Sequence, residues 1–156
     1  MHVECLVEEP SAEAALRNLV PKMVGLDVTF DVLPFQGKAD LLRKLPARLK
    51  GYSKWLPDDW LIVVLLDVDD DNCEKLKQRL ETVAQSAGLL TKSMAGPVSH
   101  FHVLNRLAVE ELEAWFFGDV EALCSAYPRL RDYLGIHNVT ERRYQMRPQA
   151  SFRRAR

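Results

Sequence analysis

The sequence has few of the residues and motifs that mark several large classes of protein. Its 156 residues include only three cysteines, Cys5, Cys73 and Cys124, and no Cys-x-x-Cys pair. An odd number of widely spaced cysteines argues against a disulfide framework or a zinc–cysteine site, so we expect three free thiols in a reducing compartment, each a small core residue. The dinucleotide-binding motif Gly-x-Gly-x-x-Gly and the hydrolase elbow Gly-x-Ser-x-Gly are also absent.

Long apolar segments are missing as well. No stretch is long enough to span a bilayer, and the first residues lack the basic and apolar regions of a secretory signal. We therefore expect a cytoplasmic protein with no membrane partner. The length suits one domain with a substantial core.

The net charge of −1 conceals an asymmetry along the chain. Residues 141–156 contain six arginines and one glutamate; subtracting these from the totals of 21 and 22 leaves 15 basic and 21 acidic residues before them. An acidic body does not resemble a non-specific DNA-binding surface, but it suits a site that recruits cations. The arginine-rich end has no apolar period, so we expect residues 1–140 to form the domain, and residues 141–156 to be a disordered tail or the product of a truncated or frameshifted reading frame.

The strongest single feature is an unbroken apolar run over residues 60–66 that ends in four aspartates within five positions: Asp67, Asp69, Asp70 and Asp71. The run predicts a strand buried on both faces, as in a parallel sheet. Four carboxylates at its end repel one another, and a hard cation such as Mg²⁺ or Mn²⁺ offsets that repulsion. The alternative is helix capping, and we expect one of Asp69, Asp70 and Asp71 to be only a cap.

Strand and helix patterns alternate along the chain. Strands are predicted over residues 2–8, 27–33, 60–66 and 98–107, and helices over residues 10–23, 37–50, 71–87 and 109–117, with a further turn over residues 118–127. Pro21 is expected to kink or end the first helix, and Pro46 to interrupt the second. The alternation predicts an α/β fold with a mostly parallel, four-stranded sheet flanked by helices.

In such a sheet ligands bind beyond the carboxyl ends of the strands. Glu8 ends the first predicted strand, and Asp67 and Asp69 end the third. Side-chain alternation along an extended strand would put Asp67 and Asp69 on one side. Three carboxylates meeting there would suit metal-assisted phosphoryl chemistry, with Asp71 as a further ligand.

The Glu8 segment and the Asp67-x-Asp69 pair resemble the Toprim pattern found in topoisomerases, primases and overcoming-lysogenisation-defect nucleases. More narrowly, the chain resembles the bacterial, Toprim-like domain-of-unknown-function 4276 family over three segments: residues 7–11, 67–73 and 106–119. The resemblance implies a Rossmann-like Toprim fold, metal-dependent chemistry at Glu8, Asp67 and Asp69, and a role in phage defence. Toprim proteins commonly have Gly after the Glu; here Glu9 either adds to the metal site or, as we favour, faces solvent.

The acidic segment that follows the fourth strand supplies further candidates. Glu110, Glu111 and Glu113 are either first-turn acids favoured by the helix dipole or part of the site. We take Glu113 as a contributor to a second metal or as a base, and Glu111 and Asp119 as weaker candidates. Lys38, at a predicted helix start, is a weaker candidate for a phosphate contact.

Two functions follow from these features. The leading hypothesis is a Mg²⁺- or Mn²⁺-dependent nuclease or related phosphodiester-processing protein, with nucleic acid as partner, Glu8 as ligand or general acid–base, and Asp67 and Asp69 as ligands. The alternative is a non-catalytic interaction or regulatory module that binds a defence-system protein. A homodimer is compatible with either. A metal role for His100 and His102, which alternate on the predicted fourth strand, is a weaker hypothesis.

Overall fold

The structure is a computed structural model that describes all residues except 26, 97–99, 110–111, 113–117 and 134–156. It consists of two compact units, Met1–Leu112 and Glu113–Arg156. The first unit contains the sheet and most of the candidate site residues.

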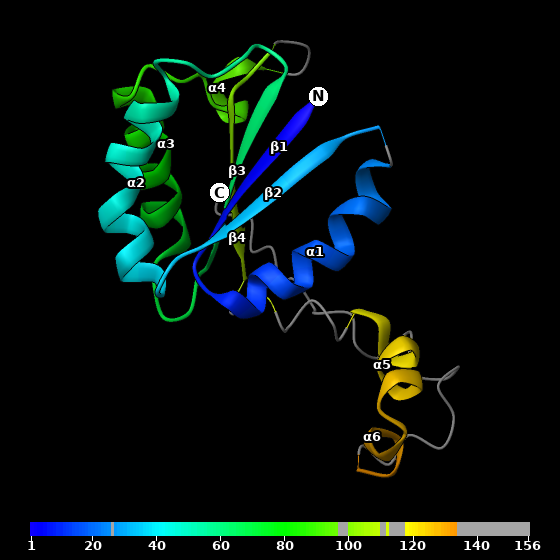
Figure 1. Cartoon of the computed structure of the whole chain (residues 1–156). Coiled ribbons are helices and arrows are strands. Elements are labelled where there is room, and N and C mark those ends of the chain that lie inside the picture. Colours follow the sequence, from blue (N-terminus) through cyan, green and yellow to red (C-terminus); the bar gives the residue numbers. More distant parts are fainter. Residues whose placement is uncertain (26, 97–99, 110–111, 113–117, 134–156) are drawn as a thin grey trace, which may run out of the picture. The chain divides into compact units, whose positions relative to one another are not determined.

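Four parallel strands form the sheet: β1 (His2–Val7), β2 (Thr29–Pro34), β3 (Trp60–Asp67) and β4 (Val103–Ala108). Their order is β2-β1-β3-β4, so β1 and β3 are central and adjacent (Figure 1). The predicted α/β class and four-stranded parallel sheet are confirmed. The predicted apolar run is β3: on one face Ile62, Val64 and Leu66 are fully buried, and on the other face Leu65 is buried and Leu61 and Val63 are partly buried.

Helices cover both faces of the sheet. In Figure 1, α2 (Lys38–Tyr52) and α3 (Cys73–Ser86) lie on one side of the sheet, and α1 (Pro10–Val24) lies on the other. Alternation along β1 divides the core in the same way. Leu6 joins the cluster formed with α2 and α3, whereas Val3, Cys5 and Val7 join the cluster formed with α1.

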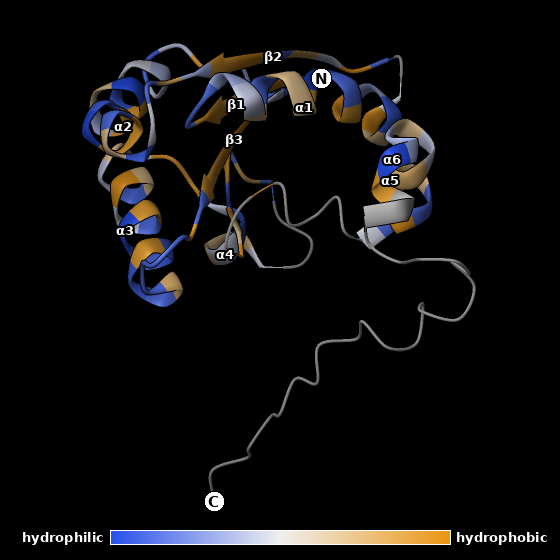
Figure 2. Cartoon of the chain, turned by 90° about the horizontal axis from the view of Figure 1, so that it is seen from below, coloured by the Kyte–Doolittle hydropathy of each residue, from blue (hydrophilic) through white to orange (hydrophobic). Residues whose placement is uncertain are grey.

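The hydropathy of each element follows this layering. In Figure 2, β3 is largely hydrophobic, whereas α1, α2 and α3 carry both hydrophobic and hydrophilic residues. The buried stripe of α2 consists of Leu41, Leu45 and Leu49, each fully buried, at the i, i+4, i+8 spacing that places them on one face. Amphipathic helices on both faces therefore complete the two cores.

Neither of the two helix prolines ends its helix. α1 continues three residues past Pro21 and ends at Val24, where the Gly25 N–H donates to the Pro21 carbonyl at 3.2 Å. α2 runs through Pro46 to Tyr52, so the predicted interruption is wrong. Proline removes one backbone donor, and the buried leucines on both sides of Pro46 hold the helix together.

The fourth strand starts later than predicted. β4 begins at Val103, and part of the preceding segment forms a short helix, α4 (Lys92–Ala95). The carbonyl of Leu90 accepts hydrogen bonds from the N–H groups of His102 and Val103, which draws the chain into the sheet only at that point. His100 and His102 therefore precede the strand and do not alternate along it; their rings make an edge contact, with centroids 5.1 Å apart.

In the second unit the structure describes α5 (Val120–Ala126) and α6 (Pro128–Tyr133). The predicted turn after residue 118 is therefore helical. Most of the predicted helix over 109–117 and the whole tail 141–156 lie outside the described residues. Among the described residues, no helix has the length and hydropathy required to cross a membrane.

The three cysteines are free, as expected. Cys5 and Cys124 are buried, but Cys73 is exposed. The prediction that Cys73 is a core residue is wrong because it is the first residue of α3, ahead of the buried stripe that begins at Leu76.

Candidate functional site

Two acidic side chains are buried side by side at the carboxyl end of the sheet. Glu8 directly follows β1, and Asp67 is the last residue of β3, which pairs with β1 through Val7 and Leu65. Glu8 is 9% exposed and Asp67 is 8% exposed. The sequence placed both residues at strand ends but left open whether the two strands are neighbours, and the strand order shows that they are.

The connection between β2 and α2 is fixed against Glu8. The Phe35 N–H donates to the Val7 carbonyl at 2.9 Å, and the Gly37 N–H donates to the Glu8 carbonyl at 2.7 Å. Gly37 has a φ of 87°, a left-handed conformation that glycine adopts without steric cost. This turn starts α2 at Lys38 and brings the side chain of Lys38 to the strand ends.

Lys38 is the cation of the site. Its Nζ donates to the Val68 carbonyl at 3.1 Å, and lies 2.5 Å from Asp69 Oδ2 and 3.0 Å from Asp71 Oδ2. Burial acts to lower the pKa of Lys38, but the hydrogen bonds to Asp69 and Asp71 outweigh it, so the pKa is raised. A charged ammonium group therefore partly balances the carboxylates that follow β3.

Asp69 lies outside the extended strand that ends at Asp67. β3 ends at Asp67, and Asp69 has a φ of 47°, which turns the chain out of the strand. The side chain of Asp69 is 48% exposed. The alternation argument that placed both acids on one side therefore does not apply, because it requires extended backbone at both positions.

None of the aspartates caps α3. The cap is Asn72, whose side-chain oxygen accepts from the Lys75 N–H at 2.9 Å, because the helix begins at Cys73 and not at residue 71. The prediction that one of Asp69, Asp70 and Asp71 serves only as a cap is wrong. Asp69 and Asp71 instead pair with Lys38.

Glu8 is in an unusual electrostatic environment. Burial, and next the charge of Asp67, raise its pKa to about 7, against a smaller opposing effect of Lys38; Asp69 and Glu9 add to the increase. Its Oε2 atom is buried and has no hydrogen-bond partner. A buried carboxylate oxygen without a partner is costly, and either a proton or a cation would reduce that cost.

Glu8 and Asp67 supply the hard oxygen donors that Mg²⁺ and Mn²⁺ prefer. Glu8, Asp67 and Asp69 do not, however, bring one oxygen each within 4.8 Å of one another; among the described residues that criterion selects a different group, at the other end of β1. Of the predicted ligands, Glu8 and Asp67 are thus the buried oxygen donors at this edge of the sheet, whereas Asp69 and Asp71 are paired with Lys38.

The other predicted site residues are not assembled here. Glu9 is exposed, as we favoured, and accepts a hydrogen bond from the Ser11 hydroxyl at 2.7 Å. Asp119 lies in the second unit, where its carboxylate caps α5 by accepting from the Ala122 N–H at 3.0 Å. Glu111 and Glu113 lie outside the described residues.

A basic groove next to the strand ends was not predicted. It has a volume of about 720 Å³ and is lined by residues of α2, α3 and the turn before α3: Lys38, Ala39, Leu42, Arg43, Asp71, Asn72, Lys75, Leu76 and Arg79. Four basic side chains and one acid line it, although Arg43 also pairs with Asp40. The sequence signal was the four-residue spacing of Lys75 and Arg79, which places them on one helical face.

A parallel α/β sheet with carboxylates buried at adjacent strand ends defines the class of this protein. Within that class, residues 7–142 match the model of one protein family, the domain of unknown function DUF4276. The chain belongs to this family. The predicted membership of the DUF4276 family is thereby confirmed. Neither a curated protein nor a solved structure matches the chain.

The raised pKa of Glu8 has a consequence for stability in the absence of divalent ions. Between its ordinary pKa of 4.5 and the folded value of about 7, the folded state holds a proton that the unfolded state has lost. The free energy of unfolding should therefore fall as the pH rises through this window. Glu8→Gln should remove that slope and be more stable than the wild type above pH 7, by about 1–3 kcal/mol.

Urea denaturation with EDTA at several pH values between 4 and 8 measures this effect. The control is Glu74→Gln, which removes an exposed carboxylate from the first turn of α3 and should retain the wild-type slope. Parallel curves for the wild type and Glu8→Gln would contradict the electrostatic description of Glu8.

Proposed function

We propose that this chain is a Toprim-like, Mg²⁺- or Mn²⁺-dependent nuclease, or a closely related protein that processes phosphodiesters. The observation that carries the proposal is the buried, unpartnered Oε2 atom of Glu8 beside the buried carboxylate of Asp67. Burying two neighbouring carboxylates is costly for stability alone. A bound divalent cation would offset the repulsion between the two carboxylates, and cation binding would explain why both are buried there.

In this proposal Glu8 and Asp67 hold the ion, and Asp69 and Asp71 turn toward it when they release Lys38. A bound ion would supply charge stabilisation at a phosphoryl oxygen and an activated water. The Glu8 carboxyl, whose pKa lies near neutrality, suits a general acid–base that moves a proton to or from the attacking or leaving oxygen. Once released, the ammonium group of Lys38 is available to a substrate phosphate.

The basic groove supports nucleic acid as the substrate class. Lys38 belongs both to the groove lining and to the carboxylate cluster, so the two features are continuous. The amino ends of α2 and α3 also border the groove, and helix amino ends favour phosphate groups. A phosphodiester chain in the groove would therefore lead to Glu8 and Asp67.

The second candidate is a non-catalytic interaction or regulatory module. The ion pairs of Lys38 with Asp69 and Asp71 favour it, because they neutralise part of the acidic cluster without any metal. For both candidates, the resemblance to bacterial family members supports a role in phage defence. The partner of the nuclease would be nucleic acid, and the partner of the non-catalytic module would be a defence-system protein.

Substitution at the strand ends should separate the two candidates. Glu8→Gln is expected to lower the rate of Mg²⁺- or Mn²⁺-dependent cleavage by about 10²–10⁴, the usual contribution of a general acid–base. Asp67→Asn should reduce cleavage to background because it removes a metal ligand. Fluorescently labelled single- and double-stranded DNA and RNA would serve as substrates, with circular dichroism to establish that each variant folds.

The matched control is Asp70→Asn, which neutralises an exposed carboxylate in the same turn and should leave cleavage unchanged. Wild-type protein that cleaves none of these substrates with either ion, while both strand-end variants retain the binding of a defence-system partner, would favour the non-catalytic module.

The groove can be tested separately from the chemistry. In an Asp67→Asn background, the added substitutions Lys75→Ala and Arg79→Ala should weaken nucleic-acid binding measured by fluorescence anisotropy. If each side chain contacts one phosphate, the slope of log K against log salt should fall in magnitude by about 1.4–1.8.

The control is a double variant that removes two positive charges outside the groove. Lys22→Ala with Lys54→Ala removes two exposed lysines that do not line the groove, and should change the slope little. Equal losses in the two double variants would mean that net charge, and not the groove, attracts the nucleic acid.

A further inference from the structure

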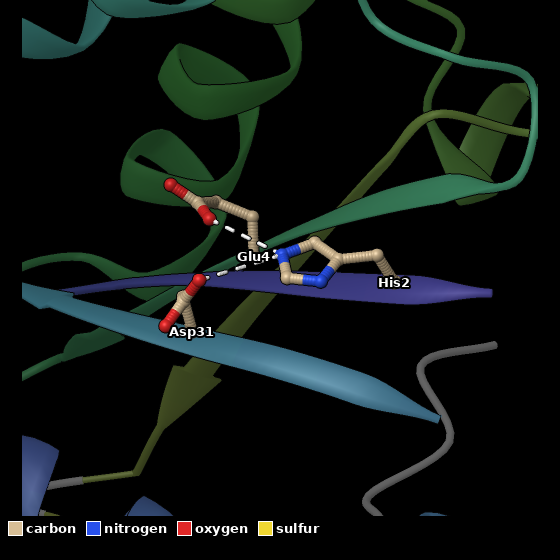
Figure 3. A group of neighbouring side chains, drawn as sticks. All are labelled: His2, Glu4 and Asp31. Carbon is tan, nitrogen blue, oxygen red and sulfur yellow. Dashed lines mark ion pairs between the residues drawn. The ribbon is translucent and has the colours of Figure 1, made fainter. Parts of the chain in front are cut away.

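A second cluster of ligand-type side chains lies at the opposite end of β1 from Glu8. His2 and Glu4 are two positions apart on β1, so they project from the same face of the sheet, and Asp31 of β2 is the register partner of Glu4. Figure 3 shows the carboxylates of Glu4 and Asp31 converging on the imidazole of His2. We refer to these three residues as the amino-end cluster.

The distances within the amino-end cluster suit a shared ion better than direct hydrogen bonds. His2 Nε2 lies 3.6 Å from Glu4 Oε2 and 3.9 Å from Asp31 Oδ2, beyond the range of about 2.7–3.2 Å for N–H···O bonds. Nε2 is buried and has no hydrogen-bond partner. Ligand atoms placed tetrahedrally around Zn²⁺ at about 2.1 Å lie about 3.4 Å apart. One ligand atom from each residue lies within 4.8 Å of the others.

The surroundings hold two of these ligands in place. His2 Nδ1 and Thr29 Oγ1 share a hydrogen bond of 2.8 Å; with Nδ1 as donor, Nε2 presents the lone pair that a metal requires. The Trp60 ring stacks obliquely on the imidazole, with centroids 4.0 Å apart. The hydroxyl of Tyr52 donates to Glu4 Oε1, the oxygen that does not face His2. These contacts are the outer-shell support that metal ligands usually have.

The charges and the exposure of the amino-end cluster also favour a bound cation. Glu4 and Asp31 are directly opposite on adjacent strands, where like charges destabilise a sheet. Glu4 is 8% exposed and His2 is 12% exposed, whereas Asp31 is 69% exposed. A cation between them would offset the repulsion, and the open side at Asp31 gives it access from solvent and room for a water ligand.

We infer that His2, Glu4 and Asp31 form a binding site for a zinc-class divalent ion, with water in the remaining position. The imidazole selects Zn²⁺ over Mg²⁺, which prefers oxygen ligands only. The ion ties β1 to β2 at their amino ends. The site is independent of the proposed nuclease chemistry, since Glu4 and Glu8 are four residues apart along β1, or roughly 13 Å.

Isothermal titration calorimetry of the tag-free protein with Zn²⁺ tests the inference. In excess Mg²⁺, which occupies sites made of oxygen ligands alone, the wild type should bind one equivalent of Zn²⁺ that Mg²⁺ does not displace. The melting temperature measured in the same buffer should rise when Zn²⁺ is added. His2→Gln and Asp31→Asn should each abolish the binding or weaken it by at least about tenfold, and Tyr52→Phe should weaken it by about tenfold through the loss of outer-shell support. Asp31 is exposed, so its conservative variant should fold.

Two controls separate this site from other metal binding. His100→Ala removes an exposed histidine elsewhere and should retain the zinc equivalent. Glu8→Gln with Asp67→Asn removes the carboxylates at the carboxyl end and should also retain it, whether or not the nuclease proposal holds. Wild-type protein that binds no Zn²⁺, or variants of His2 or Asp31 that bind it as the wild type does, would overturn the inference.

Discussion

Two carboxylates buried next to each other, at the ends of the two central parallel strands, determine the electrostatics of the candidate site. The strand order places β1 beside β3, and their carboxyl ends bring Glu8 and Asp67 together away from water. Burial, and next the charge of Asp67, disfavour ionisation of Glu8 and raise its pKa. A fold selected only for stability has little reason to keep such a pair, and apolar side chains at both positions would avoid the cost.

Lys38 determines how far that cost is offset. It is the first residue of α2, and the connection that leads into α2 is fixed to the end of β1 by backbone hydrogen bonds from Phe35 and Gly37. Its ammonium group balances Asp69 and Asp71, and leaves Glu8 Oε2 without a partner. Lys38 thus neutralises the exposed carboxylates of the site but not the buried Oε2 atom of Glu8. A divalent ion at Glu8 and Asp67 would complete this balance and make Lys38 available in the basic groove.

Much of the fold was predictable because it depends on local patterns. The apolar run of β3, the helical spacing of the leucines in α2 and the regular alternation of elements identify a parallel α/β sheet, and parallel strands necessarily bring Glu8 and Asp67 to one edge. The orientation of Asp69 was not predictable in this way, because it depends on one left-handed backbone conformation. The ion pair of Lys38 with Asp71 joins residues 33 positions apart. The amino-end cluster depends on the register between Glu4 and Asp31, and the basic groove on how α2 and α3 face each other; neither is encoded in a short segment.

Anomalous X-ray scattering from crystals soaked in Mn²⁺ tests most directly whether a divalent ion binds at Glu8 and Asp67. We expect a peak bounded by Glu8 and Asp67, with Asp69 or Asp71 turned toward it and Lys38 displaced from its carboxylate partners. Absence of a peak at saturating Mn²⁺, with Glu8 and Asp67 well ordered and Lys38 still paired with Asp69 and Asp71, would contradict it and favour a protein that uses this surface for binding alone.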